Sequence, residues 1–280
     1  MIPVAFDYQR ATSVDDAIAK LAASGGKAIA GGHSLVPLMK LRLSEPGTLV
    51  DISKIAGLSG IKDAGGKIEI GATTTHAEIA ASKLLRDQCP IVAEAAAEIG
   101  DPQVRNRGTI GGSIAHADPA SDLPAVMIAL DADIQIKGAK GARSVKASAF
   151  FRGFYDVDLQ PGELIVSVQF APVKSAAYAK LHQKASHYAI VGAAVALDVN
   201  GGVIQSARVG LTGATTHAVR LAGVEKALAG KNADGVAAAV ASAASEAGDI
   251  NGDLHASAEY RSAMIPVFVK RAVERALARF

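Results

Sequence analysis

Two glycine pairs constrain this chain more than any other feature of its sequence. Gly31 and Gly32 stand in "AGGHS", and Gly111 and Gly112 stand in "TIGGS" about eighty residues later. Glycine has no Cβ, so backbone N–H groups in such a turn can converge on an anion. A predicted helix follows each pair, and its N-terminal end also favours negative charge. Two such loops predict free amides that hold two linked phosphates from two sides, and hence a dinucleotide.

The common nucleotide-binding motifs do not account for these loops. No G-x-G-x-x-G follows the first predicted strand, which argues against a Rossmann site. Gly26-Lys27 and Gly66-Lys67 are each followed by an apolar residue, so neither pair belongs to a Walker A loop.

The predicted elements indicate an α+β fold that begins with a βαβ unit. Ser13 and Asp16 have the spacing of a helix N-cap, and the glycines after Ser24 end that helix. The stretch "KAIAGG" is predicted as a short strand that runs into the first glycine pair, and "TLVDI" as a second strand. In the next stretch, Thr75 and Glu78 predict a capping box at a helix start. "KIEIGA" alternates as a strand does, and "ELIVSVQF" is predicted as a further strand of an antiparallel sheet.

The last part of the chain is predicted to form a hairpin followed by helices. "AIVGAAVALDV" and "VIQSARVGLTG" read as strands joined by the turn "NGG". Three Ala-rich helices are expected to begin near His217, Ala233 and Ala258. The chain therefore divides into three predicted segments, residues 1–55, 56–172 and 173–280.

Composition limits the chemistry that this chain can perform. Cys89 is the single cysteine, so the chain can hold no four-cysteine iron–sulfur cluster and no multi-thiolate zinc site. The formal charge is +2, aromatic residues make up 4%, and the basic residues form no stripe, so no nucleic-acid partner is expected. The apolar runs are too short to cross a bilayer and the first residues lack a signal-peptide pattern, which favours the cytoplasm.

Three stretches carry a resemblance to a known family. "AGGHSLVPLMKLRL", "VRNRGTIGGSIAHADPASDLPA" and "KLHQKASHYAIVGAAV" closely resemble the FAD-binding medium subunit of the molybdenum hydroxylases. That family includes bacterial carbon monoxide dehydrogenase, and its FAD domain also occurs in xanthine dehydrogenase. The resemblance spans nearly the whole chain. It implies the fold of the p-cresol methylhydroxylase and vanillyl-alcohol oxidase type, with two α/β subdomains that bind FAD, followed by an antiparallel sheet with helices.

The resemblance also implies which residues contact FAD. The first loop carries over as Ala30, Gly31, Gly32, His33, Ser34 and Leu35, and the second as Thr109, Ile110, Gly111, Gly112 and Ser113. Four further positions carry over singly. Asp122 matches an acidic position that bonds a sugar-like hydroxyl of FAD, and Leu164 matches an apolar position that lines the cofactor site. Lys180 matches a basic position near the cofactor, and Tyr188 matches a tyrosine that lies against the isoalloxazine ring. Ser113 and Lys184 depart from the commonest family residues, Asn and Arg, but neither departure removes a backbone amide.

The resemblance further implies partners that supply the other cofactors. Molybdopterin-bound molybdenum is expected in a large subunit and [2Fe–2S] clusters in a small one, in an (αβγ)2 arrangement. This chain would then pass electrons from the clusters through FAD to an external acceptor, and it is expected to contribute no catalytic residue and no metal ligand.

Three alternatives from other classes stay open at this point. The first is a self-contained FAD oxidase of the vanillyl-alcohol oxidase type, although only 12 residues are Phe or Tyr. The others are an enzyme similar to UDP-N-acetylenolpyruvoylglucosamine reductase and a binding module without redox activity.

Several polar residues also have purely structural interpretations. His76 follows a capping Thr and is expected at a helix end or a subunit contact. His116 and Asp118 are interpreted as part of a turn before Pro119. Asp122 could instead cap the helix that follows it.

Overall fold

The computed structural model describes residues 1–280, and its first part is the predicted βαβ unit. Three parallel strands lie in the order β1-β3-β2 and are flanked by two helices. These elements are β1 (Asp7–Arg10), α1 (Val14–Ser24), β2 (Lys27–Ile29), α2 (Leu35–Lys40) and β3 (Thr48–Asp51). The Ser13 side chain accepts a hydrogen bond from the Asp16 amide at the start of α1, and Gly25 ends the helix with a φ of 61°. Both predicted ends of α1 are confirmed.

The middle part is built on a five-stranded antiparallel sheet in the order β4-β5-β10-β6-β7. Its strands are β4 (Ile61–Asp63), β5 (Ile68–Gly71), β6 (Asp133–Gly138), β7 (Gly141–Lys146) and β10 (Leu164–Phe170). A short α9 (Ala147–Phe150) leads to a small hairpin of β8 (Phe151–Gly153) and β9 (Asp156–Val157). The antiparallel sheet expected after the parallel unit is therefore present.

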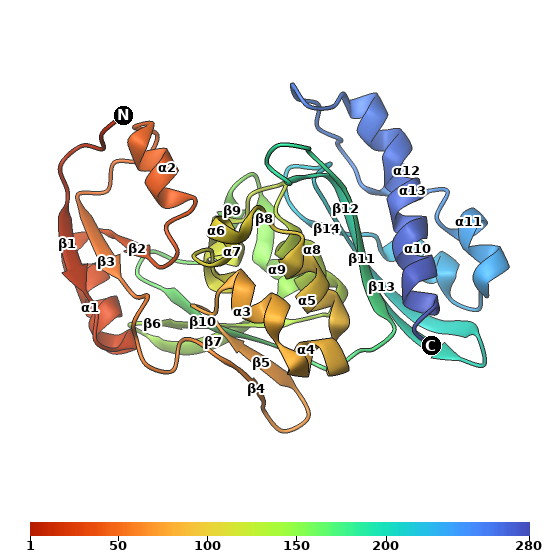
Figure 1. Cartoon of the computed structure of the whole chain (residues 1–280), viewed down its shortest axis with the longest axis horizontal. Coiled ribbons are helices and arrows are strands. Elements are labelled where there is room, and N and C mark those ends of the chain that lie inside the picture. The colour runs from red at the N-terminus through yellow and green to blue at the C-terminus, as the bar shows by residue number, and fades with distance from the viewer.

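A block of helices separates β5 from β6 and packs on this sheet (Figure 1). The helices are α3 (His76–Ala81), α4 (Lys83–Gln88), α5 (Pro90–Ala97), α6 (Pro102–Arg105), α7 (Ile110–His116) and α8 (Asp122–Ala129). The capping box at the start of α3 is confirmed, because Thr75 and Glu78 each accept a hydrogen bond from the other's backbone amide. Every residue of α8 is buried, which explains why its sequence is apolar from Leu123 to its end.

The last part contains a four-stranded antiparallel sheet in the order β11-β12-β13-β14. Its strands are β11 (Ala176–His182), β12 (Ala189–Asn200), β13 (Val203–Thr212) and β14 (Val219–Arg220). Figure 1 shows this sheet between α5 and α8 on one side and α13 (Ala258–Leu277) on the other. Tyr178 and Ala194 belong to the core shared with the helix block, whereas Ala177 and Val195 belong to the core under α13. Both faces of the sheet are buried, so its strands are nearly continuous in apolar residues.

The predicted hairpin is confirmed, and so are two of the three helix starts, but the start near His217 is wrong. The chain pairs with β13 as β14 after His217, so α10 begins at Ala222 (Ala222–Leu228). The helix expected near Ala233 is broken into a 3-10 turn (Ala233–Gly235), α11 (Val236–Ala239) and α12 (Ala243–Glu246). The start at Ala258 is confirmed.

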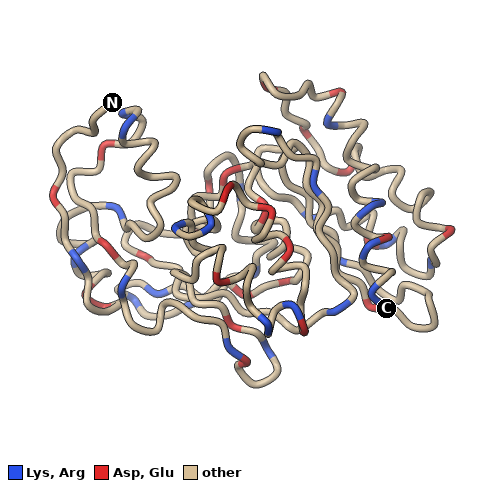
Figure 2. The backbone as a smooth tube through the Cα atoms, in the orientation of Figure 1, with Lys and Arg blue, Asp and Glu red and all other residues tan.

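Charged residues of both signs are interspersed along the backbone (Figure 2). None of the helices combines the length and the apolar character that crossing a membrane requires.

Candidate cofactor-binding site

A cavity of about 800 Å³ is lined by all three parts of the chain. Its walls come from the loop between β2 and α2, from α7, from residues 118–122 and 159–165, and from the loop before β12. The volume lies in the upper part of the range of roughly 300–1,000 Å³ that is typical of ligand pockets. Thirteen of the fifteen predicted site residues line it: Ala30, Gly31, Gly32, His33, Ser34, Leu35, Thr109, Gly111, Gly112, Ser113, Asp122, Leu164 and Tyr188.

Two predicted residues do not lie on the cavity wall. Ile110 is the first residue of α7, and its side chain is fully buried in the core of the middle part. Lys180 lies in β11 with its side chain fully buried behind the wall. Any role of these two residues at the cavity is therefore indirect.

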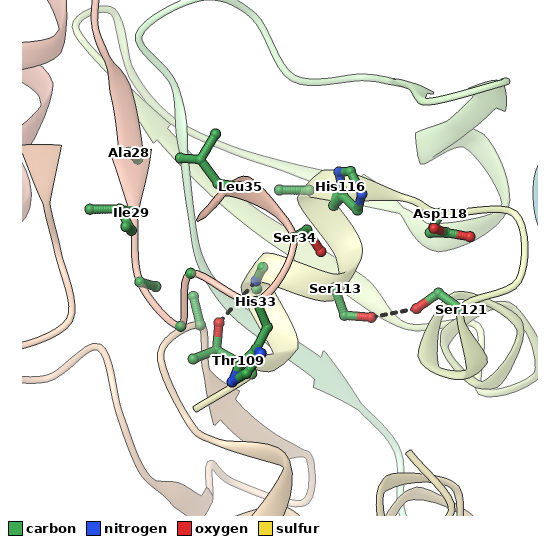
Figure 3. Close-up of a pocket in the computed structure, with 18 of the residues that line it drawn as sticks. Ala28, Ile29, His33, Ser34, Leu35, Thr109, Ser113, His116, Asp118 and Ser121 are labelled. Atoms are coloured by element: carbon green, nitrogen blue, oxygen red, sulfur yellow. Dashed lines mark hydrogen bonds between the residues drawn. The ribbon is translucent and has the colours of Figure 1, made fainter. Parts of the chain in front are cut away.

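The two glycine loops lie against each other at one end of the cavity. A Cβ on Gly31 would come within 2.8 Å of the Arg107 carbonyl carbon and within 3.0 Å of the Gly108 Cα, so only glycine permits this approach. Gly32 has a φ of 76°, in the left-handed region that favours glycine. Figure 3 shows His33 and Ser34 of the first loop beside Thr109, the N-cap of α7, and Ser113 within that helix. Loops that are far apart in the sequence thus form one continuous surface.

The loops differ in the amides that they offer to a ligand. None of the five backbone N–H groups from Gly31 to Leu35 has an acceptor within the chain. In the second loop, the amides of Ile110 to Ser113 donate to the carbonyls of Thr74, Ala72 and Thr109 and to the Thr109 hydroxyl. The sequence predicted free amides in both loops, but the structure shows them only in the first. Only the first loop therefore offers unpaired backbone amides to a ligand.

Hydroxyl groups line the second loop. Thr109 caps α7 by accepting from the Gly112 amide at 3.1 Å, and its own hydrogen is left to donate. The Ser113 and Ser121 hydroxyls lie 2.7 Å apart (Figure 3). The second loop therefore contributes side-chain groups to the cavity rather than backbone amides.

A buried charged group lies beneath the cavity. Asp122 is 4% exposed, and its Oδ1 accepts from the Tyr178 hydroxyl at 2.6 Å and lies 3.0 Å from the Lys180 Nζ. Burial raises the pKa of Asp122, while Lys180 and the Tyr178 hydroxyl favour its charged form. Both partners bind Oδ1, so Oδ2 has no partner within the chain. The ion pair, rather than a helix cap, accounts for Asp122, because no side chain caps α8.

Sequence reasoning missed a second polar group on the cavity wall. Tyr155 donates to the Asp118 carboxylate at 3.0 Å, and its ring lies 4.9 Å from the ring of His116. His116 and Asp118 both line the cavity, and burial lowers the pKa of His116. Burial and the nearby Asp118 raise the pKa of Tyr188, which is half-exposed. The signal in the sequence is the His-Ala-Asp triplet before Pro119.

His76 is a further wall residue that the sequence did not assign to the site. It begins α3 as expected, but its side chain is only 5% exposed and packs under Gly108. Burial lowers the His76 pKa to about 4, helped by His33 and Arg105. Its Nδ1 has no partner. The imidazole is therefore neutral at physiological pH.

Comparisons with known proteins agree with this fold and cavity. Residues 4–172 match the family described as the FAD binding domain in molybdopterin dehydrogenase, and residues 176–276 match the CO dehydrogenase flavoprotein C-terminal domain. The chain is 41% identical to the carbon monoxide dehydrogenase medium chain of Hydrogenophaga pseudoflava, covering 100% of this chain and 99% of that one. It is also 41% identical to the 6-hydroxypseudooxynicotine dehydrogenase complex subunit alpha of Paenarthrobacter nicotinovorans, covering 100% and 97%.

A solved structure gives the same result. The chain superposes on a chain of the cyanide-inactivated Cu,Mo-CO dehydrogenase crystal structure with a TM-score of 0.96, 40% identity and full coverage of both chains.

The fold and the cavity define an FAD-binding flavoprotein of the predicted type, which confirms the fold class and the cofactor. The chain belongs to the FAD-binding medium subunits of the molybdenum hydroxylases, with carbon monoxide dehydrogenase among its relatives. Because the match to such subunits spans the full length, a self-contained oxidase of the vanillyl-alcohol oxidase type is not favoured.

Proposed function

We propose that this chain holds FAD in the 800 Å³ cavity and passes electrons between [2Fe–2S] clusters and an external acceptor. The observation that carries the proposal is the row of five unpaired amides from Gly31 to Leu35 at a cavity of cofactor size. Bound FAD supplies the chemistry, because a flavin takes up two electrons and can release them one at a time.

The charges on the cavity wall support a diphosphate held by backbone amides. Lys27 is the single lysine or arginine on the wall, which also carries four carboxylates: Asp101, Asp118, Asp122 and Glu163. Side-chain cations therefore cannot balance the two phosphate charges. Amides that face an anion in a desolvated cleft can do so, since hydrogen bonds to charged groups are about twice as strong as neutral ones.

Further roles follow from the positions of the remaining wall residues. Thr109 and Ser113 are placed to donate hydroxyl hydrogens at the second loop, and the free Oδ2 of Asp122 to accept from a sugar-like hydroxyl. Leu164 supplies apolar contact, and Tyr188 covers one face of the flavin ring. Ile110 fills the core beneath the second loop and fixes it indirectly.

The other redox centres are proposed to lie in partner chains. Cys89 is alone and buried, so this chain holds no iron–sulfur cluster. We propose a large molybdenum-binding subunit and a small [2Fe–2S] subunit, in an (αβγ)2 assembly in the cytoplasm. The two relatives at 41% identity are named for different substrates, which supports placing substrate choice in the large subunit. We also propose that segments 1–55 and 56–172 bind FAD and that 173–280 covers it.

The test is to purify the chain alone and the complex that it brings down. The isolated chain should carry one FAD, shown by flavin absorbance. Its flavin should be reduced by an oxidisable substrate only when molybdenum and iron–sulfur partners are present. Turnover of substrate by the isolated chain would overturn the relay, and a chain that takes up no FAD would overturn the cofactor site.

A further inference from the structure

Lys180 has a coordination that leaves nothing for a ligand. Its side chain is fully buried, and its Nζ lies 3.0 Å from Asp122 Oδ1, 3.0 Å from the Glu98 carbonyl and 2.8 Å from the His187 carbonyl. An ammonium group has three hydrogens and accepts none. All three are therefore used within the chain, by acceptors from three separate segments.

One of these acceptors belongs to the loop that carries Tyr188. This loop, residues 183–188, joins β11 to β12. It curls around Gln183. The side-chain Oε1 of Gln183 accepts from the backbone amides of Ala185 and Ser186, and the backbone amide of Gln183 donates to the Tyr188 carbonyl at 2.9 Å. His187 has a φ of 62°, a left-handed conformation that is costly for a residue with a Cβ. The bond from Lys180 to the His187 carbonyl holds the chain in that conformation one residue before Tyr188.

A second acceptor ties the same ammonium to the cavity. Asp122 lines the cavity and shares its Oδ1 between Lys180 and Tyr178. Lys180 thus joins the carboxylate beneath the cavity to the loop that brings an aromatic ring to its wall, and the two cannot shift independently.

We infer that Lys180 is a positioning residue, which acts on the bound flavin through the Tyr188 loop and makes no contact with the cofactor itself. The inference rests on the proposed function, because it requires a flavin beside Tyr188. It differs from a direct contact in one measurable respect. Loss of Lys180 should change the environment of the flavin only in protein that has Tyr188.

The experiment uses the FAD-loaded protein and the fluorescence of its flavin, which an adjacent tyrosine ring quenches. Lys180→Met alone would leave Asp122 buried without its counter-charge, so every Lys180→Met variant also carries Asp122→Asn, which leaves neither position charged, and its reference is the protein with both native residues. Lys180→Met is then compared with and without Tyr188→Leu. Lys184→Met is the matched control, because Lys184 is an exposed lysine of the same loop with no partner within the chain.

We expect Lys180→Met to relieve flavin quenching when Tyr188 is present and to cause no further change in Tyr188→Leu. Lys184→Met should leave the quenching as it is. Equal changes with and without Tyr188, in variants that still bind FAD, would show that Lys180 does not act through Tyr188 and would overturn the inference. A parent protein without FAD would instead overturn the proposed function, so the two failures are distinct.

Discussion

The contact between the two glycine loops makes Gly31→Ala the sharpest test of the cofactor site. The new Cβ would lie 2.8 Å from the Arg107 carbonyl carbon and 3.0 Å from the Gly108 Cα, and closer still to the Arg107 oxygen. These are backbone atoms, so no change of rotamer relieves the overlap. Since ordinary contact begins near 3.4 Å, the loops must separate by at least about 0.6 Å.

A displacement of this size should weaken FAD binding, because it moves backbone amides of the first loop. Overpacking of this kind costs about 1–3 kcal/mol of stability. An amide that moves away from the diphosphate loses a hydrogen bond to a charged group, worth about 1.5–3 kcal/mol. At 1.4 kcal/mol for each factor of ten, the Kd for FAD should rise about 10- to 150-fold.

The assay titrates apoprotein with FAD and measures unfolding in urea on the same samples. Gly25→Ala is the control, because Gly25 has a φ of 61°, has no neighbouring atom within 4 Å and lies off the cavity wall. A left-handed Ala costs about 1–2 kcal/mol, so the two variants should lose similar stability. We expect a raised Kd only in Gly31→Ala. A wild-type Kd there, or an equal rise in Gly25→Ala, would refute the reasoning.

Three further changes test the surroundings of the cavity. Asp122→Asn deprives the buried Lys180 of its carboxylate, so the free energy of unfolding should fall by about 3–5 kcal/mol, and an unchanged urea midpoint would contradict this. The His76 pKa falls from 6.5 in the unfolded chain to about 4 in the folded one, so stability that is full above pH 6.5 is lost as the pH falls to 4, by about 3 kcal/mol. His76→Asn should flatten that loss in urea titrations, and an equally steep loss would show that another group causes it. Thr75→Ala removes the capping box with Glu78, so the free energy of unfolding in urea should fall by about 1 kcal/mol. An unchanged value would show that other contacts fix the start of α3.

Features with a local cause could be predicted from the sequence. The Ser13 and Thr75 side chains each cap a helix by accepting from the backbone amide three residues further on, and the β12–β13 turn depends on Gly201 and Gly202, with φ of 57° and 78°. The wrong helix start near His217 had a tertiary cause, because pairing with β13 keeps residues 219–220 extended. The same holds for Lys180, whose sequence position gave no sign of its three acceptors.

The two glycine pairs show where sequence reasoning stops. Gly31 permits close contact between the loops and Gly32 supplies a positive φ, whereas a Cβ on Gly111 would meet the backbone of Ala72, and one on Gly112 the Thr109 hydroxyl. A glycine pair predicts that another group approaches the backbone closely. That group can be a loop, a strand, a capping side chain or a ligand. In the second loop the approaching groups belong to the chain itself, because the amides of residues 110–113 already donate to acceptors within the chain. The first loop is therefore the one that offers free backbone amides to a ligand, and the second loop packs against it.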